Sequence, residues 1–361
     1  MVRAEAAFLR LLRLPFAYGG VAGVALGAAL AVHAGAPLDP LRYALVQVLV
    51  TSFQLMVHCA NDHFDREGDR AGLRTAWSGG SGVLTAGALA PNAALAAALV
   101  FAAAGCAAAA ALVAAGRPLA AGLGVAVGVL AWCYSAPPIR LAQRGWGEAD
   151  AVAVVAILVP ATAYAAFTGS LDVHRLLSAL APAAAAMFAM MLAVELPDCG
   201  FDLLAGKRTL AVRWGPATTA RILPLPAALA LALAAAAALR LDGILGAMLL
   251  GPAAACALVL VWRALGDPKP AAIAFGGVAL YATLVTALTG VYALAALHRD
   301  QRPASLLGRV ARAHNDGRSR QAKRAALPPL AREPPGCLLR SAVPRSTTST
   351  SRPENARVST R

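Results

Sequence analysis

Long apolar stretches are the feature that most restricts the fold of this chain. The hydrocarbon core of a bilayer is about 30 Å thick, so a helix that crosses it needs roughly 20 apolar residues. Charged, Pro-rich and Gly-rich clusters divide the chain into nine such runs: Phe16–His33, Leu41–Ala60, Asn92–Ala115, Leu119–Ser135, Ala149–Phe167, Leu176–Val194, Thr218–Leu239, Ile244–Ala264 and Ala271–Leu297. We therefore predict an all-α integral membrane protein with nine transmembrane helices.

Composition supports this class and argues against two others. Hydrophobic residues make up 59% of the chain and charged residues 14%, with a mean hydropathy of +0.64. From Pro303 onward there are 12 basic and 3 acidic residues, so most of the net charge of +14 belongs to the tail. We therefore expect no nucleic-acid partner. The six cysteines stand singly without a C-x-x-C pair, which argues against a disulfide framework or a zinc site.

The basic residues also predict the orientation and the domain boundary. If the N-terminus is cytoplasmic, 14 basic residues flank the runs on that side and 4 on the other, as the positive-inside rule requires. We predict a multi-pass protein of the cell (inner, cytoplasmic) membrane, and we expect its functional site to face the cytoplasm. With nine crossings, the start of the basic tail would lie on the outer side of the membrane, which conflicts with the positive-inside rule. Residues 1–302 are the predicted transmembrane domain, and residues 303–361 are a predicted disordered tail.

Acidic residues gather where two of the runs end, on the same predicted face. If the helices continue, the members of each cluster spaced four residues apart line one stripe. Like charges at this spacing repel, and burial near the membrane adds to the cost, so a positive partner is required. One such cluster alone would be explained as a solvated helix end, but two on one face are not. The clusters are Asp62, Asp65, Glu67 and Asp69, preceded by Asn61, and Glu195, Asp198 and Asp202.

Hard divalent cations are the natural partners of such carboxylates. Mg²⁺ in particular is usually bound by one or two carboxylates, waters and the phosphates of a substrate. The clusters therefore predict a phosphorylated substrate. Arg70 and Arg74 follow the first cluster and Lys207 and Arg208 the second, where they could contact an anion.

These residues resemble the motifs of the UbiA-type intramembrane prenyltransferases. Residues 61–69, N-D-H-F-D-R-E-G-D, resemble the family motif N-D-x-x-D-x-x-x-D. Residues 198–202 with 206–210, G-K-R-T-L, resemble its second motif, D-x-x-x-D followed by G-K-R-T-L. Arg13-Leu14-Pro15 and the segment Y-S-A-P-P-I-R-L at 134–141 are also similar to family segments. The resemblance covers roughly residues 10–297 and implies nine transmembrane helices around a central cavity.

The resemblance also implies an activity and a set of site residues. The activity is Mg²⁺-dependent transfer of a polyprenyl group from prenyl diphosphate to an acceptor, usually aromatic, inside the membrane lipid. Asn61, Asp65 and Asp69 would bind one Mg²⁺ and Asp198 and Asp202 another, with Asp62 as a further candidate ligand. Lys207, Arg13, Arg74 and Arg140 would contact the diphosphate, and Tyr134 the acceptor. The candidate catalytic residues are Asp65, Asp69, Asp198, Asp202 and Lys207.

The acceptor and one competing class of function stay open. The G-K-R-T-L ending favours the 1,4-dihydroxy-2-naphthoate branch of quinone (menaquinone) biosynthesis. However, residues 195–198, E-L-P-D, depart from the N-N-x-R-D run of naphthoate-type members, so 4-hydroxybenzoate, a tetrapyrrole and a glycerol-phosphate lipid remain alternatives. A cation-coupled secondary transporter would also use paired intramembrane carboxylates.

Four further polar residues near these motifs have ordinary explanations. His58 and His63 flank the first motif, and without any Cys/His spacing they are expected to be hydrogen-bonded rather than zinc ligands. Glu148 and Asp150 directly follow a loop. We expect both to be acids at a helix N-terminus, where the helix dipole favours negative charge.

Overall fold

The computed structural model describes residues 2–69, 80–266 and 269–301, with side chains for residues 4–66, 80–266 and 269–299. Every element in these segments is helical, including one π-helix, η1. The elements are α1 (Val2–Leu11), α2 (Leu14–His33), α3 (Pro40–Asp69), α4 (Pro91–Ala114), α5 (Pro118–Ser135), α6 (Gly147–Ala151), η1 (Val152–Leu158), α7 (Val159–Thr168), α8 (Val173–Glu195), α9 (Cys199–Leu204), α10 (Leu210–Trp214), α11 (Pro216–Ile222), α12 (Pro224–Met248), α13 (Gly251–Leu265) and α14 (Pro270–Gln301).

Proline marks the start of many of these helices. Pro91, Pro118 and Pro216 each occupy the first turn of a helix. Proline has no N–H group, and the N–H groups of a first turn have no partner within the helix, so the residue costs little there. The Pro-containing clusters that separate the apolar runs in the sequence therefore become helix starts.

The predicted all-α membrane fold is confirmed, and the nine predicted runs agree approximately with the helices, with shifted ends. Eight helical segments of the described chain are long and apolar enough to cross a bilayer, and α13 is a further, shorter apolar helix. The chain is therefore a multi-pass membrane protein. The largest shift concerns the seventh run, because α12 continues past Leu239 and breaks at Gly243, with φ 62° and ψ −138°. Glycine adopts such a conformation without steric cost, and the predicted eighth run begins at the next residue.

The structure also contains a helix that the apolar runs did not predict. α1 precedes the first span and is too short to cross a bilayer. Its Ala7 and Leu11, four residues apart, are both buried, as one face of an amphipathic helix would be. Arg13, with φ 48°, then turns the chain into α2.

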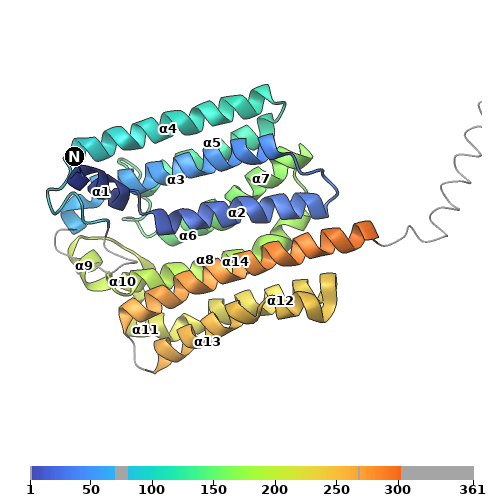
Figure 1. The fold of residues 1–361 in the computed structure, drawn as a ribbon. Coiled ribbons are helices and arrows are strands. Elements are labelled where there is room, and N and C mark those ends of the chain that lie inside the picture. Colours follow the sequence, from blue (N-terminus) through green and yellow to red (C-terminus); the bar gives the residue numbers. More distant parts are fainter. Residues whose placement is uncertain (1, 70–79, 267–268, 302–361) are drawn as a thin grey trace, which may run out of the picture. The chain divides into compact units, whose positions relative to one another are not determined.

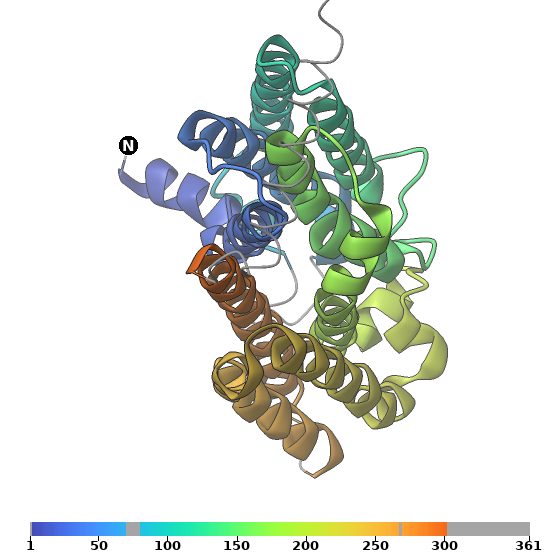
Figure 2. The same cartoon turned by 90° about the vertical axis from the view of Figure 1, so that its right-hand side faces the viewer.

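The helices form two packed groups that meet at α2 and α7. α3, α4 and α5 lie in one half of Figure 1, and α8, α12, α13 and α14 lie in the other, with α2 between them. Each half has its own hydrophobic core, and both cores include residues of α2 and α7. Figure 2, turned by 90°, views these helices from the end at which α14 finishes.

Small residues allow the helices to approach closely. A Cβ atom at Gly105 of α4 or at Gly128 of α5 would lie 2.5 Å or 2.7 Å from the ring of Phe53, which therefore fits between the two glycines. A Cβ atom at Gly27 of α2 would lie 2.1 Å from the carbonyl oxygen of Pro160 in α7. Close packing of this kind stabilises helix bundles in lipid, where the hydrophobic effect gives no net drive between helices.

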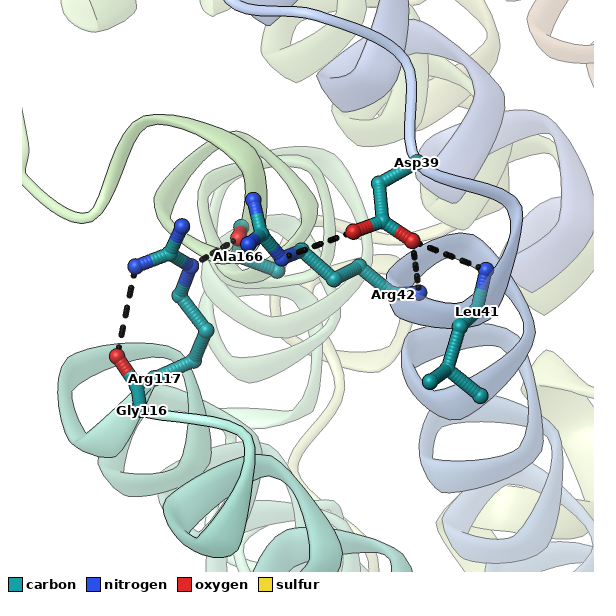
Figure 3. Close-up of polar contacts among 6 residues, drawn as sticks. All are labelled: Asp39, Leu41, Arg42, Gly116, Arg117 and Ala166. Atoms are coloured by element: carbon teal, nitrogen blue, oxygen red, sulfur yellow. Dashed lines mark hydrogen bonds and ion pairs between the residues drawn. The ribbon is translucent and has the colours of Figure 1, made fainter. Parts of the chain in front are cut away.

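Polar contacts brace one end of the bundle, at the start of α3 (Figure 3). Asp39 Oδ1 accepts hydrogen bonds from the backbone N–H groups of Leu41 (3.0 Å) and Arg42 (3.2 Å), which caps the helix. Arg117 Nε donates to the carbonyl oxygen of Ala166 at 2.7 Å and so links the start of α5 to the end of α7. These contacts lie at the opposite end of α3 from its acidic residues.

The last helix finishes at this same end. Arg299 Nη1 of α14 donates to the carbonyl oxygen of His33 at the end of α2, at 2.9 Å. The start of α2 lies at the other end, because His58, close to the acidic motif, bonds the carbonyl oxygen of Leu12. α14 therefore ends on the face opposite to the acidic motifs, as an odd number of crossings requires.

Candidate active site

The first acidic cluster lies on the last turns of α3. Because α3 continues to Asp69, Asn61, Asp65 and Asp69 fall on one stripe, as the spacing predicts. Asp65 is buried, with 5% of its surface exposed. The side chain of Asp69 and the whole of Arg74 lie outside the described residues.

Asp62, on the same turn of α3, has a different partner. Its carboxylate accepts hydrogen bonds from the backbone N–H (3.1 Å) and the hydroxyl group of Ser81. This contact fixes the segment that begins at Gly80 against the end of α3. Part of the hydrogen-bonding capacity of Asp62 is therefore used by the protein itself.

The second acidic cluster lies just beyond α8. α8 ends at Glu195, and Asp198 is the N-cap residue of α9. Asp198 and Asp202 therefore belong to one new turn, in which the Asp202 N–H donates to the Asp198 carbonyl oxygen at 2.8 Å. α9 ends at Leu204, and Gly206, just beyond it, adopts a left-handed conformation with φ 73°. The N–H of Lys207 donates to the carbonyl oxygen of Asp202 at 2.9 Å, the pattern of a glycine-terminated helix. This turn returns Lys207 to the side of Asp202.

The two clusters meet around a single cation. Lys207 Nζ lies 3.4 Å from Asp65 Oδ2 and 3.3 Å from Asp202 Oδ1. The exposed fractions of the three side chains are 17%, 3% and 13%, so this ion-pair network is largely excluded from water. Two carboxylates buried side by side without a cation would cost several kcal/mol. The contact brings together two motifs that are more than a hundred residues apart in sequence.

Burial also affects the acidity of the second cluster. Burial raises the pKa of Asp202 above its ordinary value, and the ammonium group of Lys207 opposes this shift. The positive charge of Lys207 therefore favours the ionised form of Asp202, against the effect of burial. A bound divalent cation would have the same effect.

Gln143, which the sequence reasoning missed, extends this network. Its Nε2 donates to Asp65 Oδ1 at 3.3 Å, and its Oε1 accepts from Arg140 Nη1 at 3.3 Å. Arg140, a predicted diphosphate contact, is thus connected to Asp65 through the side chain of Gln143. No pattern in the sequence singles out Gln143, because it stands in a loop and its role depends on where that loop packs.

The same loop holds the segment that carries Lys207. The N–H of Arg208 donates to the carbonyl oxygen of Gln143 at 3.1 Å, and the N–H of Leu210 donates to Glu148 Oε1. A Cβ atom at Gly145, where φ is 81°, would lie 2.5 Å from the Arg208 carbonyl oxygen, so the approach requires glycine. Glu148 thus binds another segment of the chain, which is more than the expected role of a helix N-terminal acid.

A chamber lies inside the bundle beside these residues. Its polar part, about 170 Å³, is lined by Arg13, Asn61, Tyr134 and Asp150. Its apolar part, about 200 Å³, is lined mainly by aliphatic and aromatic side chains from α2, α3, α5, α7, α8, α14 and η1. Both parts share the wall residues Val57, His58, Ala131, Val154 and Val155. A part with several polar lining residues therefore lies next to an apolar part.

Seven of the predicted site residues thus fall into two sets. Asp65, Asp202 and Lys207, with Arg140 through Gln143, form the ion-pair network. Arg13, Asn61 and Tyr134 line the polar part of the chamber. His58 and His63 are hydrogen-bonded to the carbonyl oxygens of Leu12 and Pro91, as expected.

The chemistry of these donors fits Mg²⁺. Carboxylate and amide oxygens are the ligands that this ion prefers, and it commonly uses only one or two carboxylates from a protein. Among the described side chains, no three His, Cys, Asp or Glu residues converge as a complete metal-binding group. Lys207 supplies, between two buried carboxylates, the positive charge that a cation would supply there.

The comparison with known families agrees with this geometry. The sequence matches the UbiA prenyltransferase family over residues 21–281, well over half of the chain. The chain belongs to the UbiA prenyltransferase family. The predicted family and the predicted enzyme class, a prenyltransferase, are therefore confirmed.

Solved structures of UbiA homologues share this fold. One is a UbiA homologue from Archaeoglobus fulgidus bound to GPP and Mg²⁺, with 18% identity, a TM-score of 0.57, and coverage of 79% of this chain and 99% of that one. Another is the apo UbiA homologue from Aeropyrum pernix K1, with 20% identity, a TM-score of 0.60, and coverage of 76% and 96%. A digeranylgeranylglyceryl phosphate synthase has 16% identity, a TM-score of 0.52, and coverage of 82% and 100%. Comparison with curated protein sequences gives no match.

Proposed function

We propose that this UbiA-family chain catalyses Mg²⁺-dependent transfer of a polyprenyl group from prenyl diphosphate to an aromatic acceptor. The observation that carries the proposal is the pairing of Asp65 and Asp202 through Lys207 beside a largely apolar chamber. Of the possible acceptors we favour 1,4-dihydroxy-2-naphthoate, which would place the chain in menaquinone biosynthesis.

The reaction begins with loss of the leaving group. The allylic C–O bond breaks, the diphosphate keeps the electron pair, and positive charge develops on the allylic carbon. A ring carbon of the acceptor then forms a bond to that carbon and loses its proton. Groups that bind the leaving diphosphate more strongly as its charge grows will accelerate the first step.

In this proposal the acidic motifs bind Mg²⁺, and basic residues bind the diphosphate. Asn61, Asp65 and Asp69 would bind one Mg²⁺ and Asp198 and Asp202 another, with Asp62 as a further candidate ligand. Mg²⁺, when bound, supplies positive charge to the diphosphate oxygens. Lys207, Arg140, Arg13 and Arg74 donate hydrogen bonds to the same anion.

The chamber provides the environment that an allylic cation requires. Its apolar part accommodates hydrocarbon next to the polar part, so the prenyl chain can lie inside the bundle while its diphosphate stays at the acidic motifs. Exclusion of water protects the cation from hydrolysis and strengthens the electrostatic contacts. The excess of basic residues at this end of the bundle supports a cytoplasmic site in the cell membrane.

A product assay in membranes tests the proposal. Membranes containing the chain are incubated with a radiolabelled prenyl diphosphate, Mg²⁺ and one of four acceptors, and the products are identified by mass. The acceptors are 1,4-dihydroxy-2-naphthoate, 4-hydroxybenzoate, a tetrapyrrole and a glycerol-phosphate lipid. We expect Mg²⁺-dependent prenylated naphthoate that is lost in Asp65→Ala and Asp198→Ala. A product with another acceptor would reassign the substrate, whereas ion-coupled solute uptake without any prenylated product would overturn the proposal.

Residues 303–361 are not expected to take part in the reaction. They carry the basic tail and lie beyond both acidic motifs and the family match. Deleting them is expected to change turnover in the same assay by less than about twofold, because every residue assigned a role precedes them. A large loss of turnover in a truncated protein that still inserts into membranes would contradict this prediction.

A further inference from the structure

One buried carboxyl group in the chamber has no partner. Asp150 is 8% exposed, and its Oδ1 is buried without a hydrogen-bond partner. Among the described residues, no hydrogen bond or ion pair to its carboxyl group is found. An acidic side chain buried in this way costs free energy unless something satisfies it.

The position of Asp150 at a helix start does not explain why its carboxyl group is buried without a partner. Glu148, two residues earlier, is also buried, but its Oε1 accepts the N–H of Leu210 and anchors that segment. The carboxyl group of Asp150 caps no N–H group of α6. The structural role that explains Glu148 is therefore absent for Asp150.

Asp150 instead lines the polar part of the chamber. Tyr134 forms another part of this wall, and Arg13 and Asn61 complete its polar lining. The polar part shares wall residues with the apolar part, so a molecule held here lies next to the space assigned to the prenyl chain. An aromatic side chain and an unpaired carboxyl group that line the same pocket suit a flat, polar-substituted molecule rather than hydrocarbon alone.

We propose that Asp150 accepts a hydrogen bond from a ring hydroxyl group of the aromatic acceptor and so selects hydroxylated acceptors. The inference rests on the proposed prenyl transfer and assigns to it an acceptor-binding residue. The contact orients the ring so that a carbon next to the hydroxyl-bearing carbon faces the allylic carbon. An acceptor without this hydroxyl group leaves the buried carboxyl group unsatisfied and is rejected.

The size of the selection follows from the chemistry of the contact. A site that hydrogen-bonds a substrate hydroxyl discriminates strongly against an analogue that lacks it, because the buried protein group then has no partner. A hydrogen bond to a charged group changes an equilibrium constant by roughly 10- to 150-fold. We expect a preference for the free hydroxyl of about 100-fold in kcat/KM.

The test combines two enzymes with two acceptors. Wild type and Asp150→Ala are assayed with a hydroxylated aromatic acceptor and with its O-methyl ether, with KM measured for both acceptor and prenyl diphosphate. We expect wild type to prefer the free hydroxyl by about 100-fold and Asp150→Ala to lose this preference to within a few-fold. The KM for prenyl diphosphate is expected to change by less than about twofold, because Asp150 is not among the residues assigned to the diphosphate or its Mg²⁺.

Two further variants make the result interpretable. Asp172→Asn, which removes an exposed aspartate at the start of α8, is the matched control and is expected to keep the wild-type preference. If Asp150→Ala does not fold, Asp150→Asn replaces it, and an amide oxygen that accepts a weaker bond is expected to reduce the preference about tenfold.

The outcomes separate this inference from the proposed function. An unchanged preference in the Asp150 variants, or an equal rise in the KM of both substrates, would overturn the role of Asp150 while leaving prenyl transfer intact. Absence of any prenylated product from wild type would instead overturn the proposed function.

Discussion

Asp65→Asn and Asp202→Asn are each expected to lower the kcat of prenyl transfer by about 10²- to 10³-fold. Both substitutions keep the shape of the side chain and remove its charge. The two carboxylates share the ammonium group of Lys207, at 3.4 Å and 3.3 Å, and in the proposed reaction they share the bound diphosphate. We also expect the Mg²⁺ concentration for half-maximal rate to rise in each variant.

A matched control lies on the same helix as Asp65. Asp39→Asn removes an aspartate at the opposite end of α3, where it caps the helix and pairs with Arg42 (Figure 3). Its turnover and Mg²⁺ dependence are expected to stay close to those of wild type. The double variant Asp65→Asn/Asp202→Asn should lose less than the product of the single losses, because residues of one network are not additive. Turnover within about threefold of wild type in both single variants would refute the assignment.

Gly27→Val is expected to lower the free energy of unfolding by about 3 kcal/mol or more. Even the first side-chain carbon at this position would lie 2.1 Å from the Pro160 carbonyl oxygen and 2.8 Å from the Cβ atom of Ala163. Backbone cannot move aside as a flexible side chain can, so α2 and α7 would have to separate. The measurement is thermal unfolding of the purified protein in detergent, where we expect a clear fall in Tm.

Gly122→Ala provides the matched comparison for this prediction. Gly122 lies within α5, and a Cβ atom there meets no atom within 4 Å. Alanine has a higher helix propensity than glycine, so this variant is expected to be neutral or slightly more stable, by up to about 1 kcal/mol. Equal Tm values for Gly27→Val and Gly122→Ala would show that the close approach of α2 and α7 contributes little to stability.

The acidic motifs show how much of the site structure the spacing of residues in the sequence can predict. The i, i+4, i+8 spacing of Asn61, Asp65 and Asp69 correctly predicted a helix that continues to its last acid. For the second motif the assumption of a continuing helix was wrong, because α8 ends at Glu195 and the chain restarts in α9 at Cys199. Asp198 and Asp202 still share one turn, so their expected proximity was retained for a different structural reason.

Gln143 and Asp150 show what local patterns cannot provide. Gln143 matters because its loop packs between Asp65 and the segment of Arg208. Asp150 resembles an ordinary acid at a helix start until the surrounding helices bury it in a chamber without a partner. Both roles arise from neighbours far away in the sequence.

Hydropathy, periodicity and motif spacing by themselves predicted the membrane class, the long apolar helices and the two clusters of acidic residues. These features depend on the chemistry of adjacent residues and on the thickness of a bilayer, so they can be read along the chain. Only the tertiary structure decided that Lys207 joins Asp65 to Asp202, that Glu148 anchors a loop and that Asp150 faces a chamber without a partner. Those facts depend on which helices pack together, because burial and long-range distance are properties of the packed bundle and not of any one segment.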